Sequence, residues 1–284
     1  MKNRKNKIIK NVLVVGLGLI GSSLCRALKK SSHYDKIYGH DSDDCTIEYA
    51  IKNNFIDDYK KDLKEGIKLS DLIIFCVPVH QINKILEVAK NFFNTEKIFT
   101  DTLSSKKILL EFLKYENLLE TKNFIFSHPM AGKENFGIKY SDTDLFQNTF
   151  TFISKLDNSD IYNIDAVKKM WKFAQSNTID LDVYNHDKLL SIISHVPHVI
   201  SFALSNVTSQ QNLIKSFSST CARGSLYDMT RIANSDPQAW ASIFSDNQEN
   251  IVNYLEKFII ELNKLKSLLI LNNQEDLVSY LKKS

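Results

Sequence analysis

The sequence has few cysteines, glycines and prolines, and it lacks a long uninterrupted apolar run. Its 284 residues include only 4 Cys, 8 Gly and 4 Pro. Cys25, Cys45, Cys76 and Cys221 form no CxxC pair and no zinc-ligand spacing, so we interpret them as reduced thiols of a cytoplasmic protein. No stretch of about 18 uncharged apolar residues is present, which argues against a membrane-spanning helix.

A secretory signal and a nucleic-acid-binding surface are also not expected. The segment Met1–Lys10 is basic, but the apolar residues behind it are interrupted by glycines and lack a small-residue cleavage site. The 36 basic and 33 acidic residues give a net charge of +3, and the basic residues are scattered rather than gathered in a stripe. Hydrophobic residues at 43% exclude a disordered chain, because such a chain could not bury enough apolar surface.

The pattern of apolar residues changes once along the chain. At roughly 150 residues per domain, the length favours two domains. Strand and helix patterns alternate up to Val183, with strands expected at 11–15, 36–40, 71–77, 97–100, 123–127, 150–154 and 178–183. Beyond it only helices are expected, at 187–211, 235–263 and 265–283. We therefore predict an α/β domain with a mainly parallel sheet over residues 1–183, followed by an all-helical domain over residues 184–284.

The strongest local motif joins the first expected strand to the first expected helix. Gly16, Gly18 and Gly21 form a Gly-x-Gly-x-x-Gly sequence in this strand–turn–helix context. The first glycine permits the tight turn, the second lets the backbone approach a pyrophosphate, and the third lets helix and strand pack closely. The free N–H groups at the helix N-terminus favour an anion there. The motif predicts a Rossmann-type dinucleotide-binding site, with a purely structural glycine turn as the alternative.

An acidic residue indicates which dinucleotide is bound. Asp41 lies about 20 residues after Gly21 at the end of the second expected strand, where a carboxylate accepts hydrogen bonds from the ribose of NAD. Ser42, Asp43 and Asp44 follow it, and no Arg or Lys is near. A 2′-phosphate would meet like charge there, so the sequence favours NAD over NADP.

Ligands of open α/β sheets lie beyond the carboxyl ends of the strands, and several polar residues are expected there. His128 stands where a strand passes into a loop, and a neutral imidazole can accept a proton from a substrate hydroxyl. A histidine bonded to a backbone carbonyl is the alternative for His128, and a helix cap is the alternative for Ser104. The other members of the group are Pro78, His80, Gln81, Asp101, Lys106, Pro129, Ala131, Gly132, Lys133 and Glu134.

The apolar helix expected after Val183 carries one polar face. Asp187, Ser191, Ser194, His198 and Ser201 follow one another at intervals of three or four positions, so they share a side of the helix. Serine and histidine in place of lysine and glutamate indicate a cleft or a wet interface, and a helix–helix contact is the alternative. Because proline removes a helical hydrogen bond, Pro197 is expected to kink this helix near His198.

One arginine lies shortly before the start of an expected helix. Arg231 comes shortly before Ser235 or Asp236 as the cap and Pro237 in the first turn. A guanidinium there can bind a carboxylate by two parallel hydrogen bonds. An ion pair with Asp228 or Asp236 is the alternative.

Together these segments resemble the prephenate/arogenate dehydrogenase family of tyrosine biosynthesis. The resemblance runs from residue 11 to about 258 and is carried by residues 15–22, 100–104, 127–134, 186–187, 194–198 and 228–237, followed by Trp240. It implies an NAD-dependent oxidative decarboxylation, in which hydride leaves C4 of a cyclohexadienol, the ring carboxylate leaves as CO₂ and the ring becomes aromatic. It also implies a homodimer formed through the helical domain.

The resemblance assigns roles residue by residue. His128 would act as the base toward the C4 hydroxyl, and Ser104 would orient that hydroxyl. Substrate binding would involve Arg231, His198, Ser235 and Trp240, with support from His186 and Ser194. Cofactor binding would involve Gly16, Gly18, Leu19, Ile20, Gly21, Asp41, Pro78 and Asp101. No metal is expected.

Two departures from the family pattern flank the expected pocket. Tyr227 stands where a basic residue is common, and Lys133 stands where a small hydroxyl residue is common. They leave the choice between prephenate and arogenate open. The chain ends at Ser284, so we expect no dedicated feedback domain.

Two other functions are compatible with the architecture. A sister dehydrogenase acting on a 3-hydroxy acid or an imine would be expected to place a catalytic lysine on the helical domain, where this chain offers Ser and His. A redox sensor would hold NAD without chemistry.

Overall fold

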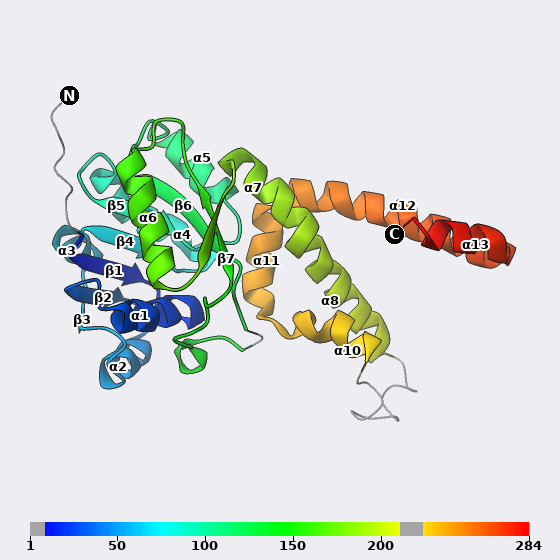
Figure 1. Ribbon diagram of the computed structural model, residues 1–284, viewed down its shortest axis with the longest axis horizontal. Helices are drawn as coiled ribbons and strands as arrows, with labels where there is room; N and C mark the ends of the chain where they lie inside the picture. The colour runs from blue at the N-terminus through cyan, green and yellow to red at the C-terminus, as the bar shows by residue number, and fades with distance from the viewer. Residues whose placement is uncertain (1–8, 134, 211–223, 284) are drawn as a thin grey trace.

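The computed structural model describes residues 9–133, 135–210 and 224–283. They form an α/β part and a helical part that reaches away from it (Figure 1). The change of architecture falls at β8 (Asn177–Asp180) and α7 (Val183–Leu190), where the sequence predicts it.

The α/β part is built on an eight-stranded sheet in the order β3-β2-β1-β4-β5-β6-β7-β8. All neighbouring strands are parallel except β6 and β7, which are antiparallel. The strands are β1 (Asn11–Val15), β2 (Lys36–His40), β3 (Asp58–Tyr59), β4 (Leu72–Phe75), β5 (Ile98–Asp101), β6 (Phe124–Pro129), β7 (Phe150–Ser154) and β8. The strand order reverses between β1 and β4, so their carboxyl ends border the crevice where ligands of such sheets bind.

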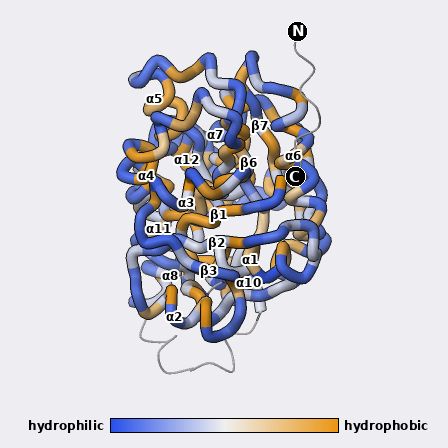
Figure 2. Tube along the Cα trace, turned by 90° about the vertical axis from the view of Figure 1, so that its left-hand side faces the viewer, coloured by the Kyte–Doolittle hydropathy of each residue, from blue (hydrophilic) through white to orange (hydrophobic). Residues whose placement is uncertain are grey.

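Helices cover both faces of this sheet, and the strands alternate between them. In β1, Val12 and Val14 pack in one core, while Leu13 and Val15 pack in the other. The first core includes residues of α1 (Leu19–Ser31) and α6 (Ile161–Phe173), and the second includes residues of α3 (Leu63–Leu69), α4 (Ile82–Ala89) and α5 (Lys107–Tyr115). Figure 2 shows apolar residues along strands in the middle of the molecule. Burial on both faces explains the continuous apolar run of β4.

Several helices begin at aspartate or asparagine caps. The Asp43 side chain accepts hydrogen bonds from backbone N–H groups at the start of α2 (Asp44–Lys52), and Asp160 does so for α6. Asp236 caps α11 (Pro237–Asp246), with Pro237 in the first turn, as the sequence predicts. This cap fixes the residue at which α11 begins, shortly after Arg231.

The helical part starts with a long segment that is interrupted once. It consists of α7, a π-helical segment at Ser191–His195, and α8 (Val196–Ser209). Pro197 lies in the first turn of α8, so the predicted disturbance is present, but it takes the form of a π segment on the N-terminal side of the proline. The proline ring crowds the carbonyl four residues earlier, which falls within this segment.

The remaining helices are α10 (Ser225–Thr230), a 3₁₀ turn at Arg231–Asn234, α11, α12 (Gln248–Leu271) and α13 (Gln274–Leu281). The expected division at residue 264 is wrong, because α12 continues through it. The helices are separated instead at Asn247 and at Asn272, which adopts the left-handed conformation with φ 50°. The expected helix 187–211 begins earlier, at Val183, and residue 211 lies outside the described residues.

By length and composition alone, the segment Val183–Ser209 could cross a membrane. Such a finding is weak evidence, because core helices of soluble proteins also meet it. In this structure the segment carries three buried residues that form hydrogen bonds with other elements, namely His186, Asp187 and His195.

Candidate active site

The glycine loop has the conformation and the surroundings that its sequence predicts. Gly16 has φ +94°, and a Cβ there would lie 2.7 Å from the Cys76 carbonyl oxygen. A Cβ on Gly21 would lie 1.9 Å from the Gly16 carbonyl oxygen, so only glycine allows α1 to begin here. A Cβ on Gly18 would meet nothing within 4 Å, which leaves its backbone open to an approaching ligand.

Asp41 lies beside this loop. Its Oδ2 accepts a hydrogen bond from the Leu17 N–H at 2.6 Å, and its Oδ1 accepts one from the Asp43 N–H at 3.0 Å. The first turn of α1 carries no acidic residue. The loop therefore offers backbone N–H groups for a pyrophosphate and a carboxylate close by for a ribose.

One cavity of about 410 Å³ collects residues from both parts of the chain. Leu19 borders it at the start of α1, His128 at the end of β6, and Ser104 in the loop after β5. The helical part contributes Ser194, His198, Arg231, Ser235 and Trp240. Eight residues predicted as site residues thus meet at one place. Lys133, which was expected to flank the pocket, also lines the cavity, and so do Met130, Asn135, Phe136 and Asp236, which were not predicted as site residues.

The imidazole of His128 is the first member of a buried chain of hydrogen bonds. Its Nδ1 lies 3.0 Å from Nε2 of His186, and Nδ1 of His186 lies 2.7 Å from Oδ1 of Asp187. His186 is completely buried and His128 is 7% exposed. His186 therefore contacts His128 and does not itself line the cavity.

This chain determines which nitrogen of His128 carries a hydrogen. Because the Asp187 carboxylate can only accept, His186 carries its hydrogen on Nδ1, and its Nε2 is an acceptor. His128 must then donate from Nδ1 to Nε2 of His186. The lone pair of His128 therefore remains on Nε2, the nitrogen not used by the chain.

Burial keeps these histidines neutral. It lowers the pKa of His128 well below 6.5, and the nearby His186, Lys106 and His195 act in the same direction. Burial likewise lowers the pKa of His186, with contributions from Lys106 and His195. At neutral pH, His128 is thus an unprotonated imidazole that can accept a proton.

The Asp187 carboxylate is held at the N-terminus of α5. It accepts hydrogen bonds from the backbone N–H of Lys106 at 2.8 Å and 3.0 Å, and from that of Lys107 at 2.9 Å. Burial raises the pKa of Asp187, and these backbone donors oppose the rise. A helix N-terminus stabilises an anion, so the acidic end of the chain is secured by backbone groups.

The side chain of Asp101 is buried and does not line the cavity. The side chain is completely buried and forms an ion pair with Nζ of Lys106. Its Oδ1 accepts from the Ser127 N–H at 3.2 Å, and its Oδ2 accepts from the Leu103 N–H at 3.0 Å. The side chain thus connects the loop after β5 with the end of β6, and the cofactor contact expected for Asp101 stays a prediction.

The wall of the cavity in the helical part is aromatic and basic. The ring of His198 stacks on Trp240 with centroids 3.5 Å apart, and burial lowers the pKa of His198. Nδ1 of His198 lies 2.9 Å from the Ser194 carbonyl oxygen. Arg231 is exposed at the cavity in the turn before α11. A flat ring system and a cation thus line the same cavity as His128.

Of the eight predicted cofactor residues, only Leu19 lines this cavity. Pro78 is exposed in the segment that follows β4, near the point where the strand order reverses. Ile20 is half-buried and packs against the core beneath α1. The positions of both are compatible with the glycine-loop site, but only the backbone of Ile20 is at the turn.

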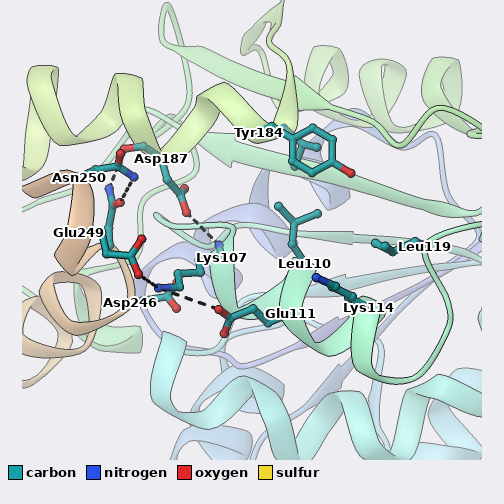
Figure 3. A pocket seen from close by; sticks show the side chains of 12 residues that line it. Lys107, Leu110, Glu111, Lys114, Leu119, Tyr184, Asp187, Asp246, Glu249 and Asn250 are labelled. Carbon is teal, nitrogen blue, oxygen red and sulfur yellow. Dashed lines mark hydrogen bonds and ion pairs between the residues drawn. The ribbon is translucent and has the colours of Figure 1, made fainter.

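A second cavity, of about 300 Å³, is bordered by Asp187, the acidic end of the histidine chain (Figure 3). Asp187 and Asp246 line it together with Lys107, whose Nζ is 3.1 Å from Oε1 of Glu249. Leu110, Leu119, Val183 and Tyr184 form its apolar side. The charged groups at this cavity pair largely with one another, and we assign no ligand to it.

Two family models match successive parts of the chain, one in each domain. Residues 24–179 match the nucleotide-binding domain of prephenate dehydrogenase, and residues 182–283 match the dimerization domain of prephenate dehydrogenase. The chain belongs to the prephenate dehydrogenase family. The fold predicted by resemblance is that of this family.

Individual relatives agree with the family assignment. A prephenate dehydrogenase of Bacillus subtilis is 29% identical over 98% of this chain and 75% of its own length. A cyclohexadienyl dehydrogenase of Zymomonas mobilis is 27% identical over 98% of this chain and 94% of its own. The crystal structure of the A. aeolicus prephenate dehydrogenase, in complex with hydroxyphenyl propionate and NAD⁺, has a TM-score of 0.86 and 29% identity, and covers 98% of this chain and 97% of that one.

Proposed function

We propose that this chain catalyses the NAD-dependent oxidative decarboxylation of prephenate to 4-hydroxyphenylpyruvate, of arogenate to tyrosine, or of both. The observation that carries the proposal is the position of His128, whose Nε2 keeps a lone pair in a cavity that it shares with Arg231. The family assignment supports the same reaction.

The glycine loop and Asp41 fit NAD. The open space at Gly18 would receive the pyrophosphate, the N-terminus of α1 would stabilise its charge, and Asp41 would accept the ribose hydroxyls. When bound, NAD supplies the acceptor for the hydride that leaves C4 of the substrate. The NAD⁺ complex of the A. aeolicus relative supports this choice of cofactor.

The chain itself handles one proton. Nε2 of His128 accepts the proton of the C4 hydroxyl as the C4–H bond breaks, and Ser104 orients that hydroxyl. The bond to the ring carboxylate then breaks, CO₂ leaves, and its electron pair enters the ring. The proton held on His128 returns to the oxygen as the ring becomes a phenol. No net proton is released, so the buried base needs no exchange with solvent.

Substrate binding follows from the charge of the cavity wall. Arg231 binds a substrate carboxylate by a charge-assisted hydrogen bond, and the stacked pair His198 and Trp240 packs against the ring. Ser194 and Ser235 complete the polar lining. Lys133 adds a second cation at the cavity, although its Nζ is 2.9 Å from Asp142.

We further propose a cytoplasmic homodimer formed through the helical part, with the domain division at 183. In Figure 1, α12 and α13 extend away from the sheet, and in α12 only Ile251 is buried. Exposed apolar residues on these helices include Ile259, Ile260, Leu269, Ile270, Leu271 and Val278. Unpaired apolar area of this kind marks an interface, and the match to a dimerization domain supports a second copy as the partner.

The decisive test of the catalytic proposal is His128→Asn. We expect NADH formation to fall by about 10²–10⁴-fold, while NAD binding measured by calorimetry stays within about threefold of wild type. A protein that only senses NAD would keep both its NAD binding and its function in this variant. Retention of wild-type turnover would remove His128 from the mechanism.

A further inference from the structure

Lys106 is a charged residue that the proposed reaction does not yet use. It is 1% exposed, and its partner Asp101 is completely buried. Nζ donates to Oδ2 of Asp101, to the Leu103 carbonyl oxygen at 2.8 Å and to the Ser127 carbonyl oxygen at 2.9 Å. Three donated hydrogen bonds require the protonated ammonium, because a neutral amine has only two hydrogens.

The acceptors of Lys106 lie next to the reacting groups. Leu103 immediately precedes Ser104, and Ser127 immediately precedes His128. The backbone N–H of Lys106 also donates to Asp187, which orients His186 and through it His128. A single residue thus connects the loop after β5, the end of β6 and the helix α7.

We propose that Lys106 is a positioning residue for the reaction, whose buried ammonium sets the distance between Ser104 and His128 by binding the two strand ends that carry them. This inference rests on the proposed function and deepens it. Lys106 does not line the cavity, so it acts through these two residues rather than on the substrate.

The cost of burying two charges supports a geometric role. An ion pair of this kind loses its hydration, and apolar side chains of similar volume would serve stability as well or better. What apolar side chains cannot provide is two directed hydrogen bonds to two different backbone segments, together with a third to the Asp101 side chain. Misplacing reacting groups by about 1 Å can lower a rate by about 100-fold, so such constraints matter to turnover.

The ammonium also acts on the electrostatics of the base. Lys106 lowers the pKa of His128 and of His186, in each case together with burial. His186 and His195 also face His128 and act in the same direction. Arg231 and Lys133 line the cavity that His128 borders, and Asp187 lies beyond His186. The Asp101 carboxylate is the opposite charge of the ion pair, but the groups that shift the pKa of His128 are His186, Lys106 and His195. Loss of the ion pair should therefore act through Lys106 and move the acid limb of the pH–rate profile to higher pH.

The test uses the double variant Asp101→Asn/Lys106→Met in the full-length protein. Removing both charges avoids leaving an unpaired buried carboxylate, which could prevent folding of Lys106→Met alone. The control is Lys29→Met, which removes another ion-paired lysine of the same domain; Nζ of Lys29, in α1, lies 2.9 Å from Oδ1 of Asp57. Steady-state rates are measured against pH, together with the Kd for NAD.

We expect kcat to fall by about 100-fold in the double variant, with KM and the NAD Kd within about threefold of the control and the acid limb shifted upward. Two results would overturn the proposal. One is a kcat within about threefold of the control with an unmoved limb, and the other is a loss of kcat matched by an equal loss of NAD binding.

A readout independent of turnover separates this inference from the proposed function. Titration of the histidine ring signals in selectively ¹⁵N-labelled protein reports the pKa of His128 directly. An upward shift in the double variant relative to Lys29→Met supports the role of Lys106 even if wild-type protein turns over neither substrate. An unchanged titration counts against it.

Discussion

Replacing Asp187 by Asn tests whether the histidine chain determines the reactive nitrogen of His128. In the wild-type protein the carboxylate accepts from two backbone N–H groups and from Nδ1 of His186. An amide has only one acceptor oxygen. The two backbone donors at the start of α5 will hold that oxygen, which turns the NH₂ group toward His186.

This rotation reverses every hydrogen bond in the chain. His186 would accept at Nδ1 and donate from Nε2 to Nδ1 of His128. His128 would then carry its hydrogen on Nε2 and could not accept the proton of the substrate. In serine-protease triads the equivalent change costs about 10⁴-fold by the same inversion. We expect kcat to fall by about 10²–10⁴-fold, which corresponds to about 3–5 kcal/mol of activation free energy.

The assay is NADH formation at saturating NAD and substrate, with circular dichroism and a melting curve to verify folding. Asp246→Asn is the matched control, because Asp246 lines the second cavity together with Asp187 but makes no contact with His186 among the described residues. A kcat of Asp187→Asn within about threefold of the control would refute the reasoning, since it would mean that the chain does not determine the hydrogen position on His128.

Three further outcomes are expected. Arg231→Ala should raise KM for the substrate by about 10–100-fold and leave the NAD Kd alone, and an unchanged KM would exclude the carboxylate contact. Steady-state rates should favour NAD strongly over NADP in wild type and less so in Asp41→Ser, so equal wild-type turnover with both would contradict the role of Asp41. The melting temperature should fall as the pH drops from 6.5 toward 4. Burial lowers the pKa of His195 to about 4. Between pH 6.5 and pH 4 the unfolded chain therefore binds a proton at this residue that the folded chain does not, which lowers the free energy of unfolding by roughly 3 kcal/mol. His195→Gln should flatten this slope, and an unchanged slope would assign the proton uptake elsewhere.

Local sequence patterns were sufficient to predict the sheet and most of the cavity. The β1 strand and its glycine turn combine a β-branched apolar run with a φ that only glycine adopts readily, so both could be read without tertiary information. His128 and Ser104 could be placed because strand ends in a parallel sheet share one edge. The two-residue strand β3 was not expected, because so short a segment has no periodicity.

The supporting residues depended on contacts that no local pattern contains. A lysine at the start of an amphipathic helix is usually exposed, yet Lys106 is buried because β5 and β6 bring carbonyl oxygens to its ammonium. The same contact explains why Asp101 faces inward. The pairing of His128 with His186, which lies 58 residues away, requires the docking of α7 on the sheet.

The most direct test of the central claim is absorbance at 340 nm with purified protein, NAD and either prephenate or arogenate in parallel. The account predicts NADH formation with at least one substrate, accompanied by equimolar CO₂ and a phenolic product. The relative rates then define the substrate preference. Confirmed NAD binding without NADH formation from either substrate would contradict the account.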